Sequence, residues 1–321
     1  MLVSNLTITL QIKMIKEQAL SQEVKDEYQK ELDLYKSEMF EYLKTIYTGS
    51  IERDHKKENY IFDFYISEKN TVIDCLSLYF DSELYRQHQY NQNKFKYLKE
   101  NNIKLIQFMS CEWFDKKEIC KNIIKNKLGL SEIKVNARNC TIEIVIGKRD
   151  DIVQFVDKFH LQGHTRYKSA FILRDKFTNE IYEILTLRSP FTRKWCGGEN
   201  LEIARFCVKK DTSVRGGFNK ILSVVLKWCK DNGYKNLLTY SSCSYSWGAT
   251  YEKSGAKFLF LTPSMYGYTC MNNEFKSIEG RFKNRAKDGL TEKQCAENKG
   301  IFRMYTVGNY AWLYELNKEI K

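Results

Sequence analysis

The sequence predicts an α/β (α+β) protein, and three observations indicate this class. The chain has 321 residues, enough for about two domains with a core each. Segments with apolar residues at helical spacing alternate with short β-branched and aromatic runs. A polar link at about 131–139 divides these segments into two series. We therefore expect an N-terminal mixed sheet with flanking helices, followed by a second α/β domain.

The first series has the order α-β-β-α-β-α. Apolar residues at helical spacing predict helices over about 12–47, 83–101 and 116–127, with Gly49 and Gly129 as stop signals. β-branched and aromatic runs predict strands over about 61–66, 71–80 and 103–109. The short polar turn between the first two strands predicts a hairpin.

The second series is richer in strands. The same patterns predict strands over 140–146, 167–173, 180–187, 201–208, 237–241, 257–261 and 301–305. They predict helices over 150–159 and from Gly216 to Asn232, a helix end at 251–255, and a basic helical tail from about 273.

Charge and cysteine usage limit the classes of function. The formal net charge of +12 favours a polyanionic partner such as DNA, although a lysine-rich solvated surface would give the same value. The ten cysteines are scattered without a Cys-x-x-Cys pair, which is typical of reduced thiols and not of a zinc site. We find no signal peptide and no apolar run that could span a bilayer. We therefore expect a soluble, cytoplasmic protein without a membrane partner; the oligomeric state stays open.

Two acidic residues interrupt the predicted hairpin strands. Asp63 lies in the first strand and Asp74 in the second, each between apolar residues. A buried carboxylate is costly unless it is paired or binds a metal. On neighbouring strands the two could hold Mg²⁺, the arrangement by which metal-dependent nucleases activate water. The alternative is two aspartates at strand edges that face solvent.

Three runs carry a resemblance to a nuclease family. They are Ile61-Phe-Asp63-Phe-Tyr-Ile66, Val72-Ile-Asp74-Cys-Leu-Ser-Leu-Tyr-Phe80-Asp81-Ser-Glu83 and Lys104-Leu-Ile-Gln-Phe-Met-Ser-Cys111-Glu-Trp113. In order and spacing they resemble the very-short-patch-repair-like domain of phage homing endonucleases, in the PD-(D/E)xK group. The resemblance implies a DNA endonuclease, a hydrolase, over 36–130. Mg²⁺ or Mn²⁺ would bind Asp63 and Asp74, with Asp81 assisting and Glu38 as the helix acid.

The chain departs from this pattern at three positions. Asp74 replaces a glutamate, Asp81 replaces the histidine expected to shuttle protons, and Cys111 replaces a second acid. An aspartate with an ordinary pKa is a poor proton shuttle at neutral pH. Two interpretations stay open: an active endonuclease with an altered cluster, or an inactive DNA-binding or assembly protein. Lys94 and Lys96 are candidate phosphate contacts, or part of a solvated helix face.

A second resemblance covers about 140–268. Its carrying runs are Ala204-Arg-Phe-Cys207, Thr212-Ser-Val-Arg-Gly-Gly-Phe-Asn-Lys220 and Tyr251-Glu-Lys-Ser-Gly255. They are similar to the GNAT acyltransferase fold, in the version found in phage homing endonucleases and Mom-like DNA-modification proteins. Arg215, Gly216 and Gly217 at a helix start could seat an anion, either coenzyme A or a DNA phosphate. The alternative is a plain glycine turn before a core helix.

The remaining expectations concern ligands and flanking segments. Relatives carry an Asp-Arg-Arg-Trp-Ser run where this chain has Ser242-Cys-Ser-Tyr-Ser246, so we favour Mg²⁺ over coenzyme A and a nuclease over a transferase. Acyl-CoA-dependent modification of nucleic acid is the weaker alternative. His160 and His164 could act as acid/base groups or as caps. The flanking segments are a helical arm at 1–35 and a basic C-terminal extension at 269–321. In that extension the candidate DNA contacts are Arg281, Lys283 and Arg285.

Overall fold

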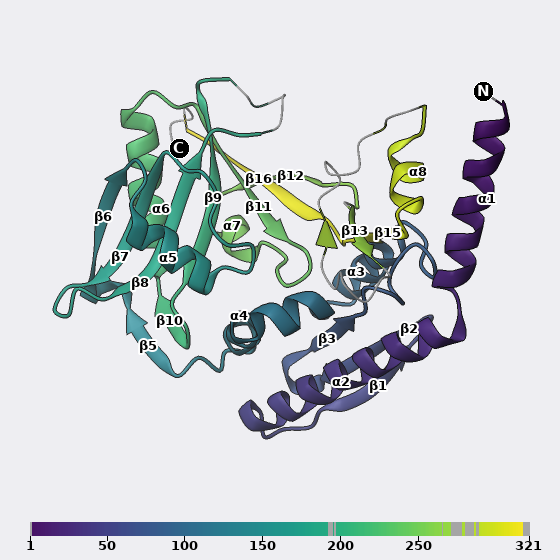
Figure 1. Cartoon of the computed structure of the whole chain (residues 1–321). Helices are drawn as coiled ribbons and strands as arrows, with labels where there is room; N and C mark the ends of the chain where they lie inside the picture. Colours follow the sequence, from purple (N-terminus) through teal and green to yellow (C-terminus); the bar gives the residue numbers. More distant parts are fainter. Residues whose placement is uncertain are drawn as a thin grey trace. The chain divides into compact units, whose positions relative to one another are not determined.

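The computed structural model describes residues 2–191, 195, 197–264, 266–270, 278–279, 286 and 289–316. The chain forms two compact units that interleave along the sequence (Figure 1). Unit 1 comprises Met1–Asp115, Cys243–Tyr245 and Pro263–Gly308. Unit 2 comprises Lys116–Ser242, Ser246–Thr262 and Asn309–Lys321. Both units contain mixed helices and sheets, so the predicted α/β (α+β) class is confirmed.

Unit 1 is built on a four-stranded sheet of order β1-β2-β3-β4. Its strands are β1 (Glu52–Lys57), β2 (Tyr60–Ile66), β3 (Thr71–Leu76) and β4 (Lys104–Met109). The helices of this unit are α1 (Leu2–Ala19), α2 (Gln22–Ile46), α3 (Tyr90–Glu100) and α8 (Glu292–Glu297). A smaller sheet joins β13 (Tyr266–Cys270), β14 (Ile278–Glu279) and β15 (Ile301–Tyr305). β3 pairs with β2 antiparallel and with β4 parallel, so the predicted mixed sheet is present.

Helix α2 supplies much of the core of unit 1. Tyr35, Met39 and Leu43 are fully buried, at the spacing that places them on one face of the helix. The sequence predicted one helix over 12–47, but the helix breaks at Ser21. The Ser21 hydroxyl accepts a hydrogen bond from the Val24 backbone N–H, which starts a new helix there.

Two more predicted boundaries in unit 1 were wrong for a common reason. The strand predicted to 80 ends at Leu76, and the helix predicted from 83 begins at Tyr90. Between them, side chains bond the backbone locally: the Ser77 N–H donates to Asp81, and the Ser82 hydroxyl donates to the Tyr79 carbonyl. Such local bonds compete with both strand and helix.

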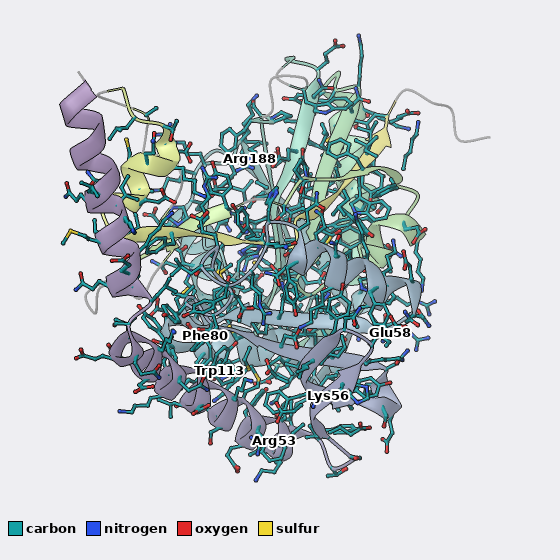
Figure 2. All side chains as sticks on the ribbon, turned by 90° about the vertical axis from the view of Figure 1, so that its right-hand side faces the viewer. Arg53, Lys56, Glu58, Phe80, Trp113 and Arg188 are labelled. Carbon is teal, nitrogen blue, oxygen red and sulfur yellow. The ribbon has the colours of Figure 1, made fainter. Side chains whose placement is uncertain are left out.

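Strand β1 was missed in the sequence because it is polar. Its run is Glu-Arg-Asp-His-Lys-Lys, and it pairs only with β2 at the sheet edge. Charged side chains at an edge discourage pairing with another chain. Arg53 and Lys56 are exposed on this strand (Figure 2), and the Arg53 guanidinium lies 4.8 Å from the centre of the Phe40 ring.

Unit 2 is built on a seven-stranded sheet of order β12-β16-β11-β9-β8-β7-β6. These strands are β6 (Cys140–Ile146), β7 (Ser169–Asp175), β8 (Ile181–Arg188), β9 (Asn200–Val208), β11 (Asn236–Ser242), β12 (Lys257–Leu261) and β16 (Asn309–Glu315). A two-stranded parallel sheet joins β5 (Ile133–Asn136) and β10 (Thr212–Arg215). The helices are α5 (Asp150–Phe159), α6 (Gly217–Asp231) and α7 (Ala249–Lys253). Helix α4 (Ser110–Leu128) begins in unit 1 and continues into unit 2.

Helices α5 and α6 cover opposite faces of this sheet (Figure 1). Ile152 and Val156 of α5 pack on Ile172 of β7, whereas the neighbouring Phe171 contacts Trp228 of α6. Successive strand residues point to opposite faces, so β7 is apolar on both sides. This explains why its sequence is a continuous apolar run.

Strand β16 is the most consequential element that the sequence analysis missed. It lies between β12 and β11, antiparallel to both, although the chain reaches it only after β15 of unit 1. The predicted basic tail is only partly described: α8 and β15 are present, and Arg281, Lys283 and Arg285 lie outside the described residues. In the part of the chain that is described, no helix is long and apolar enough to cross a bilayer.

Candidate functional site

The two strand aspartates in unit 1 each accept a hydrogen bond from the backbone of the neighbouring strand. The Asp63 carboxylate accepts a hydrogen bond from the Cys75 N–H at 2.7 Å, and Asp74 accepts one from the Asp63 N–H at 3.2 Å. These bonds cross between β2 and β3, so the structure brings the two predicted residues together. Asp74 is only 2% exposed, which excludes the alternative of a solvent-facing aspartate at that position.

Each carboxylate is paired with a lysine from a helix. Lys36 of α2 lies 2.6 Å from Asp63, and Lys94 of α3 lies 2.7 Å from Asp74. Lys94 is 6% exposed and also donates to the Ile61 carbonyl at 3.2 Å. Burial disfavours the ammonium form of Lys94, but the Asp74 carboxylate outweighs it and raises the pKa of this lysine. The ammonium form of Lys94 is therefore favoured beside Asp74.

This cluster does not fit Mg²⁺ as it stands. Burial, and then the charge of Asp74, raise the pKa of Asp63 to about 6, against the opposing effect of Lys36. Mg²⁺ needs about six oxygen ligands, and here both carboxylates are already bound by ammonium groups. Among the described residues no group of three or more His, Cys, Asp or Glu could hold a metal.

The other site residues predicted in unit 1 differ from this cluster in their contacts and exposure. Asp81 accepts from the Ser77 N–H and lies 3.5 Å from Arg86; burial raises its pKa, and the charges of Arg86 and Lys94 oppose this. Glu38 accepts a hydrogen bond from the buried Trp113 indole at 2.9 Å (Figure 2). Lys96 is exposed on α3.

The predicted anion seat lies at the N-terminus of α6 in unit 2. Gly216 is the N-cap residue with a φ of 78°, a conformation that favours glycine, and it offers no side-chain cap. No hydrogen bond in the described part of the chain uses the N–H of Gly217, Phe218 or Asn219. These groups and the helix dipole make a site for a phosphate.

A pocket of about 510 Å³ opens at this helix start. Its lining residues are Asn136, Ala137, Arg138, Arg215, Gly216 and Lys220. Arg215 and Gly216 were predicted from the sequence, whereas residues 131–139 were predicted to be a polar link. No local motif marks Arg138, because it reaches the pocket only through the pairing of β5 with β10. The volume falls in the usual range for ligand sites.

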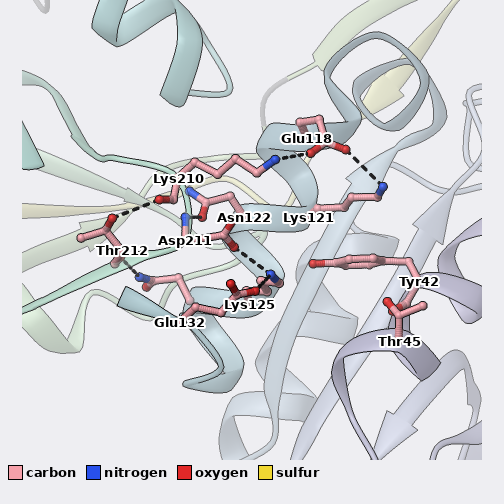
Figure 3. A network of polar contacts seen from close by, with 11 residues as sticks. Tyr42, Thr45, Glu118, Lys121, Asn122, Lys125, Glu132, Lys210, Asp211 and Thr212 are labelled. Carbon is pink, nitrogen blue, oxygen red and sulfur yellow. Dashed lines mark hydrogen bonds and ion pairs between the residues drawn. The ribbon is translucent and has the colours of Figure 1, made fainter. Parts of the chain in front are cut away.

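Contacts from α4 and β5 hold the chain segment that leads into this seat (Figure 3). The Asp211 N–H donates to the Asn122 side chain at 2.8 Å, and Lys125 lies 2.8 Å from the Asp211 carboxylate. β10 then pairs with β5 from Thr212 to Arg215. We call this α4–β5 segment, residues 116–139, the strap.

The parallel strands β9 and β11 separate beside the seat. They pair only over Asn200–Glu202 and Asn236–Leu238. Beyond these positions β9 keeps only β8 as a strand partner, and β11 keeps only β16. Ligands bind where parallel strands diverge at their carboxyl ends. Glu202 stands at the point of separation, in an ion pair with Arg188 (Figure 2).

A tyrosine lies near the same point. Tyr251 of α7 contacts the Phe218 ring at 5.4 Å and the Trp312 ring at 6.4 Å. Burial raises the pKa of Tyr251, and the neighbouring Thr239 opposes this shift. Thr239 is the first β11 residue without a β9 partner. The phenol is therefore neutral at physiological pH and can donate a proton there.

A buried glutamate adjoins the seat and was not anticipated. Glu183 of β8 is 3% exposed, and its Oε2 has no hydrogen-bond partner among the residues that the structure describes. Burial raises the pKa of Glu183 to about 8. A Cβ at position 217 would lie 2.4 Å from that oxygen, so a larger residue there would have to displace the carboxyl end of Glu183.

The two histidines have local roles. His160 accepts a hydrogen bond from the Gln162 N–H at 3.1 Å, and burial lowers the pKa of His160 to about 4, which keeps the ring neutral. His164 lies 2.8 Å from Asp157. His160 thus bonds the backbone locally, as a cap would, whereas the His164 ring pairs with a carboxylate side chain.

Comparison with known proteins gave matches among solved structures only. No protein-family model and no curated protein match the chain. The IAA acetyltransferase from Bacillus cereus is 14% identical, covering 55% of this chain and 99% of its own, with a TM-score of 0.32. A GNAT family acetyltransferase from Elizabethkingia anophelis, with acetyl-CoA bound, is 17% identical over 55% and 98%, at 0.31. A Bacillus subtilis acetyltransferase in complex with CoA is 10% identical over 55% and 98%, at 0.33. Support for any function of unit 2 therefore comes from its own strand order and pocket.

Proposed function

We propose that unit 2 is an acyltransferase whose acyl donor is an acyl thioester of coenzyme A. The observation that carries this proposal is the separation of β9 from β11 beside the glycine start of α6. This reverses the order of our sequence-based expectations, which favoured a nuclease. The pocket and the N–H groups at the start of α6 support an acyltransferase over a nuclease. An extended thioester that carries phosphates needs sites of both kinds.

The ligand would lie along the unpaired edge of β9. Its diphosphate would meet the N–H groups of Gly217 to Asn219, where the helix dipole is favourable. The segment from Val208 back to Ile203 is about 17 Å long at the usual strand rise. The amides of an extended pantetheine arm could pair with this edge, as a peptide adds to a sheet. The thioester would then reach the point of separation.

The chemistry there is acyl transfer. The lone pair of an acceptor nucleophile attacks the thioester carbonyl, a bond from the nucleophile to carbon forms, and the carbon–sulfur bond breaks. The thiolate leaves with the electron pair and takes a proton, for which Tyr251 is our candidate donor. The acceptor releases its own proton to solvent, and the Tyr251 phenolate regains a proton from solvent, which restores the phenol. Glu202 places a carboxylate beside the same point.

Calorimetric titration with coenzyme A, followed by acetyl-CoA turnover, tests the proposal. We expect saturable one-site binding and release of free thiol when an acceptor is present. Tyr251→Phe should keep the affinity and reduce turnover by about 10²- to 10⁴-fold, the usual contribution of a general acid. Tyr240→Phe, on β11, is the matched control. No binding at millimolar coenzyme A would refute the proposal.

DNA remains our proposed partner, and its bases or bound proteins are candidate acceptors. The support is the formal net charge of +12. The cytoplasm remains the proposed location, supported by the free thiols of Cys75, Cys111, Cys140, Cys207 and Cys229. A gel-shift titration against duplex DNA at several salt concentrations would test the partner.

The nuclease is the second candidate, carried by the contact of Asp63, Asp74 and Lys94. A divalent ion would have to displace Lys36 from Asp63. If the site cuts DNA, supercoiled plasmid should be nicked with Mg²⁺ or Mn²⁺, and the isosteric double variant Asp63→Asn, Asp74→Asn should lose cutting while staying folded. Equal behaviour of both proteins would eliminate this site as a nuclease and leave a DNA-binding or assembly role for unit 1.

A further inference from the structure

The pocket at α6 has a cationic wall that a diphosphate alone does not explain. We infer that Arg138 and Arg215 bind a phosphomonoester of the ligand, separate from the diphosphate at the helix start. This inference rests on the proposed function and narrows its ligand. The favoured ligand is a carrier nucleotide with a terminal phosphate on its ribose, so coenzyme A is preferred over its dephospho form.

The two arginines reach the pocket from different elements. Arg215 ends β10, and its register partner is Asn136 at the end of β5. Arg138 lies two residues further on, in the short helical turn Ala137–Asn139. Both side chains are exposed, and neither forms an ion pair with a carboxylate in the described part of the chain. Like charges in one pocket repel each other, and a bound dianion would offset this repulsion.

Lys220 holds this wall against α6. Its ammonium group donates to the carbonyl oxygens of Ala137 at 2.8 Å and Cys140 at 2.5 Å. These bonds fix the turn that carries Arg138 relative to the first turn of α6. An ammonium has three donors, so one remains for a ligand. A fixed wall loses less conformational entropy on binding than a free loop.

The chemistry of the wall matches a phosphomonoester. A guanidinium binds two phosphate oxygens at once, and two such groups suit a dianion with three terminal oxygens. The N–H groups of α6 accommodate the bridging diphosphate, which has no terminal oxygen trio to present. The two arginines therefore suit a phosphomonoester, and the start of α6 suits a bridging diphosphate.

The test compares the affinities of coenzyme A and dephospho-coenzyme A by calorimetry. For the wild type we expect coenzyme A to bind about tenfold more tightly. In Arg138→Gln the ratio should fall to within about twofold. Lys134→Gln is the matched control, since it removes one positive charge from β5 at an exposed position outside the pocket lining. It should keep the wild-type ratio.

The remaining outcomes would contradict either this inference alone or the proposed function as well. A ratio near one in the wild type, or an unchanged ratio in Arg138→Gln, would overturn this inference and leave the proposed function standing. No binding of either compound would overturn both. Displacement of coenzyme A by short duplex DNA with the same dependence on Arg138 would assign the wall to nucleic-acid phosphates instead. Thermal unfolding confirms that each variant is folded, and Arg215→Gln provides a second variant.

Discussion

Glu183 and Gly217 constrain each other at the start of α6. The carboxyl lies where the side chain of any other residue at 217 would be, and its Oε2 has no partner in the described part of the chain. A buried group in this position is stable only while it is neutral. The folded state therefore holds a proton that the unfolded chain releases at much lower pH.

This difference predicts how stability depends on pH. The pKa of Glu183 rises from 4.5 to about 8 on folding. The folded state binds more protons between these values, so the free energy of unfolding falls as the pH rises through this window. Relative to Glu183→Gln, the wild type should lose about 1.4 kcal/mol per pH unit. Chemical denaturation between pH 5 and about 8 measures this difference.

An exposed glutamate supplies the control. Glu180→Gln makes the same carboxyl-to-amide change at an exposed position of the same hairpin, where the carboxylate pairs with Lys209. A loss of stability with pH that only Glu183→Gln removes would assign the effect to the buried carboxyl. Parallel pH curves for the wild type and Glu183→Gln would show that the buried carboxyl does not titrate in this window.

The sequence identified candidate site residues, but it did not identify the residues that contact them. The proximity of Asp63 and Asp74 could be predicted from the hairpin alone, because the register of a hairpin decides which residues of its two strands lie opposite each other. Lys36 and Lys94 could not, because they approach from helices whose packing depends on the whole unit. The same holds for Glu183, whose contact with Gly217 joins elements far apart in the sequence.

At the scale of elements, periodicity predicted the amphipathic helices α5 and α6 almost to the residue. The missed elements are short or polar strands whose stability comes from a partner. β5 is Ile-Lys-Val-Asn, a run with little intrinsic signal, and it exists because β10 pairs with it. Strand propensity depends on such context more than helix propensity does.

The strap gives a prediction at this scale. Asn122→Ala removes the acceptor of the half-buried Asp211 N–H, which should cost about 1 kcal/mol, the low end of the range for an unsatisfied donor. We expect faster amide hydrogen exchange over residues 209–217 and weaker coenzyme A binding, with unit 1 unchanged. Asn93→Ala, at an exposed position on α3, is the control. Unchanged exchange in Asn122→Ala would mean that β5 alone holds the segment.

At the scale of the whole molecule, the two units are interleaved and not consecutive. The chain leaves unit 2 after Thr262, builds part of unit 1, and returns at Asn309 as β16. Tyr310, Ala311, Trp312 and Leu313 of this strand are buried between β12 and β11. The core of unit 2 therefore includes residues that lie beyond unit 1 in the sequence.

Truncation tests this dependence. A chain ending at Gly308 lacks β16, and we expect unit 2 to lose cooperative unfolding because β12 has no other strand partner. A chain ending at Leu316 keeps the strand and serves as the control. Calorimetry and near-ultraviolet circular dichroism distinguish the two. Cooperative unfolding of unit 2 in the shorter chain would show that β12 and β11 can close the sheet without it.

The late return of β16 has a consequence for synthesis on the ribosome. Domains generally fold as units while the chain emerges at about 5–20 residues per second. Here β11 and β12 emerge well before the strand that joins them, so their edges wait unpaired for several seconds. During that interval the nascent chain presents two open strand edges, the surfaces that chaperones protect and that neighbouring nascent chains can capture.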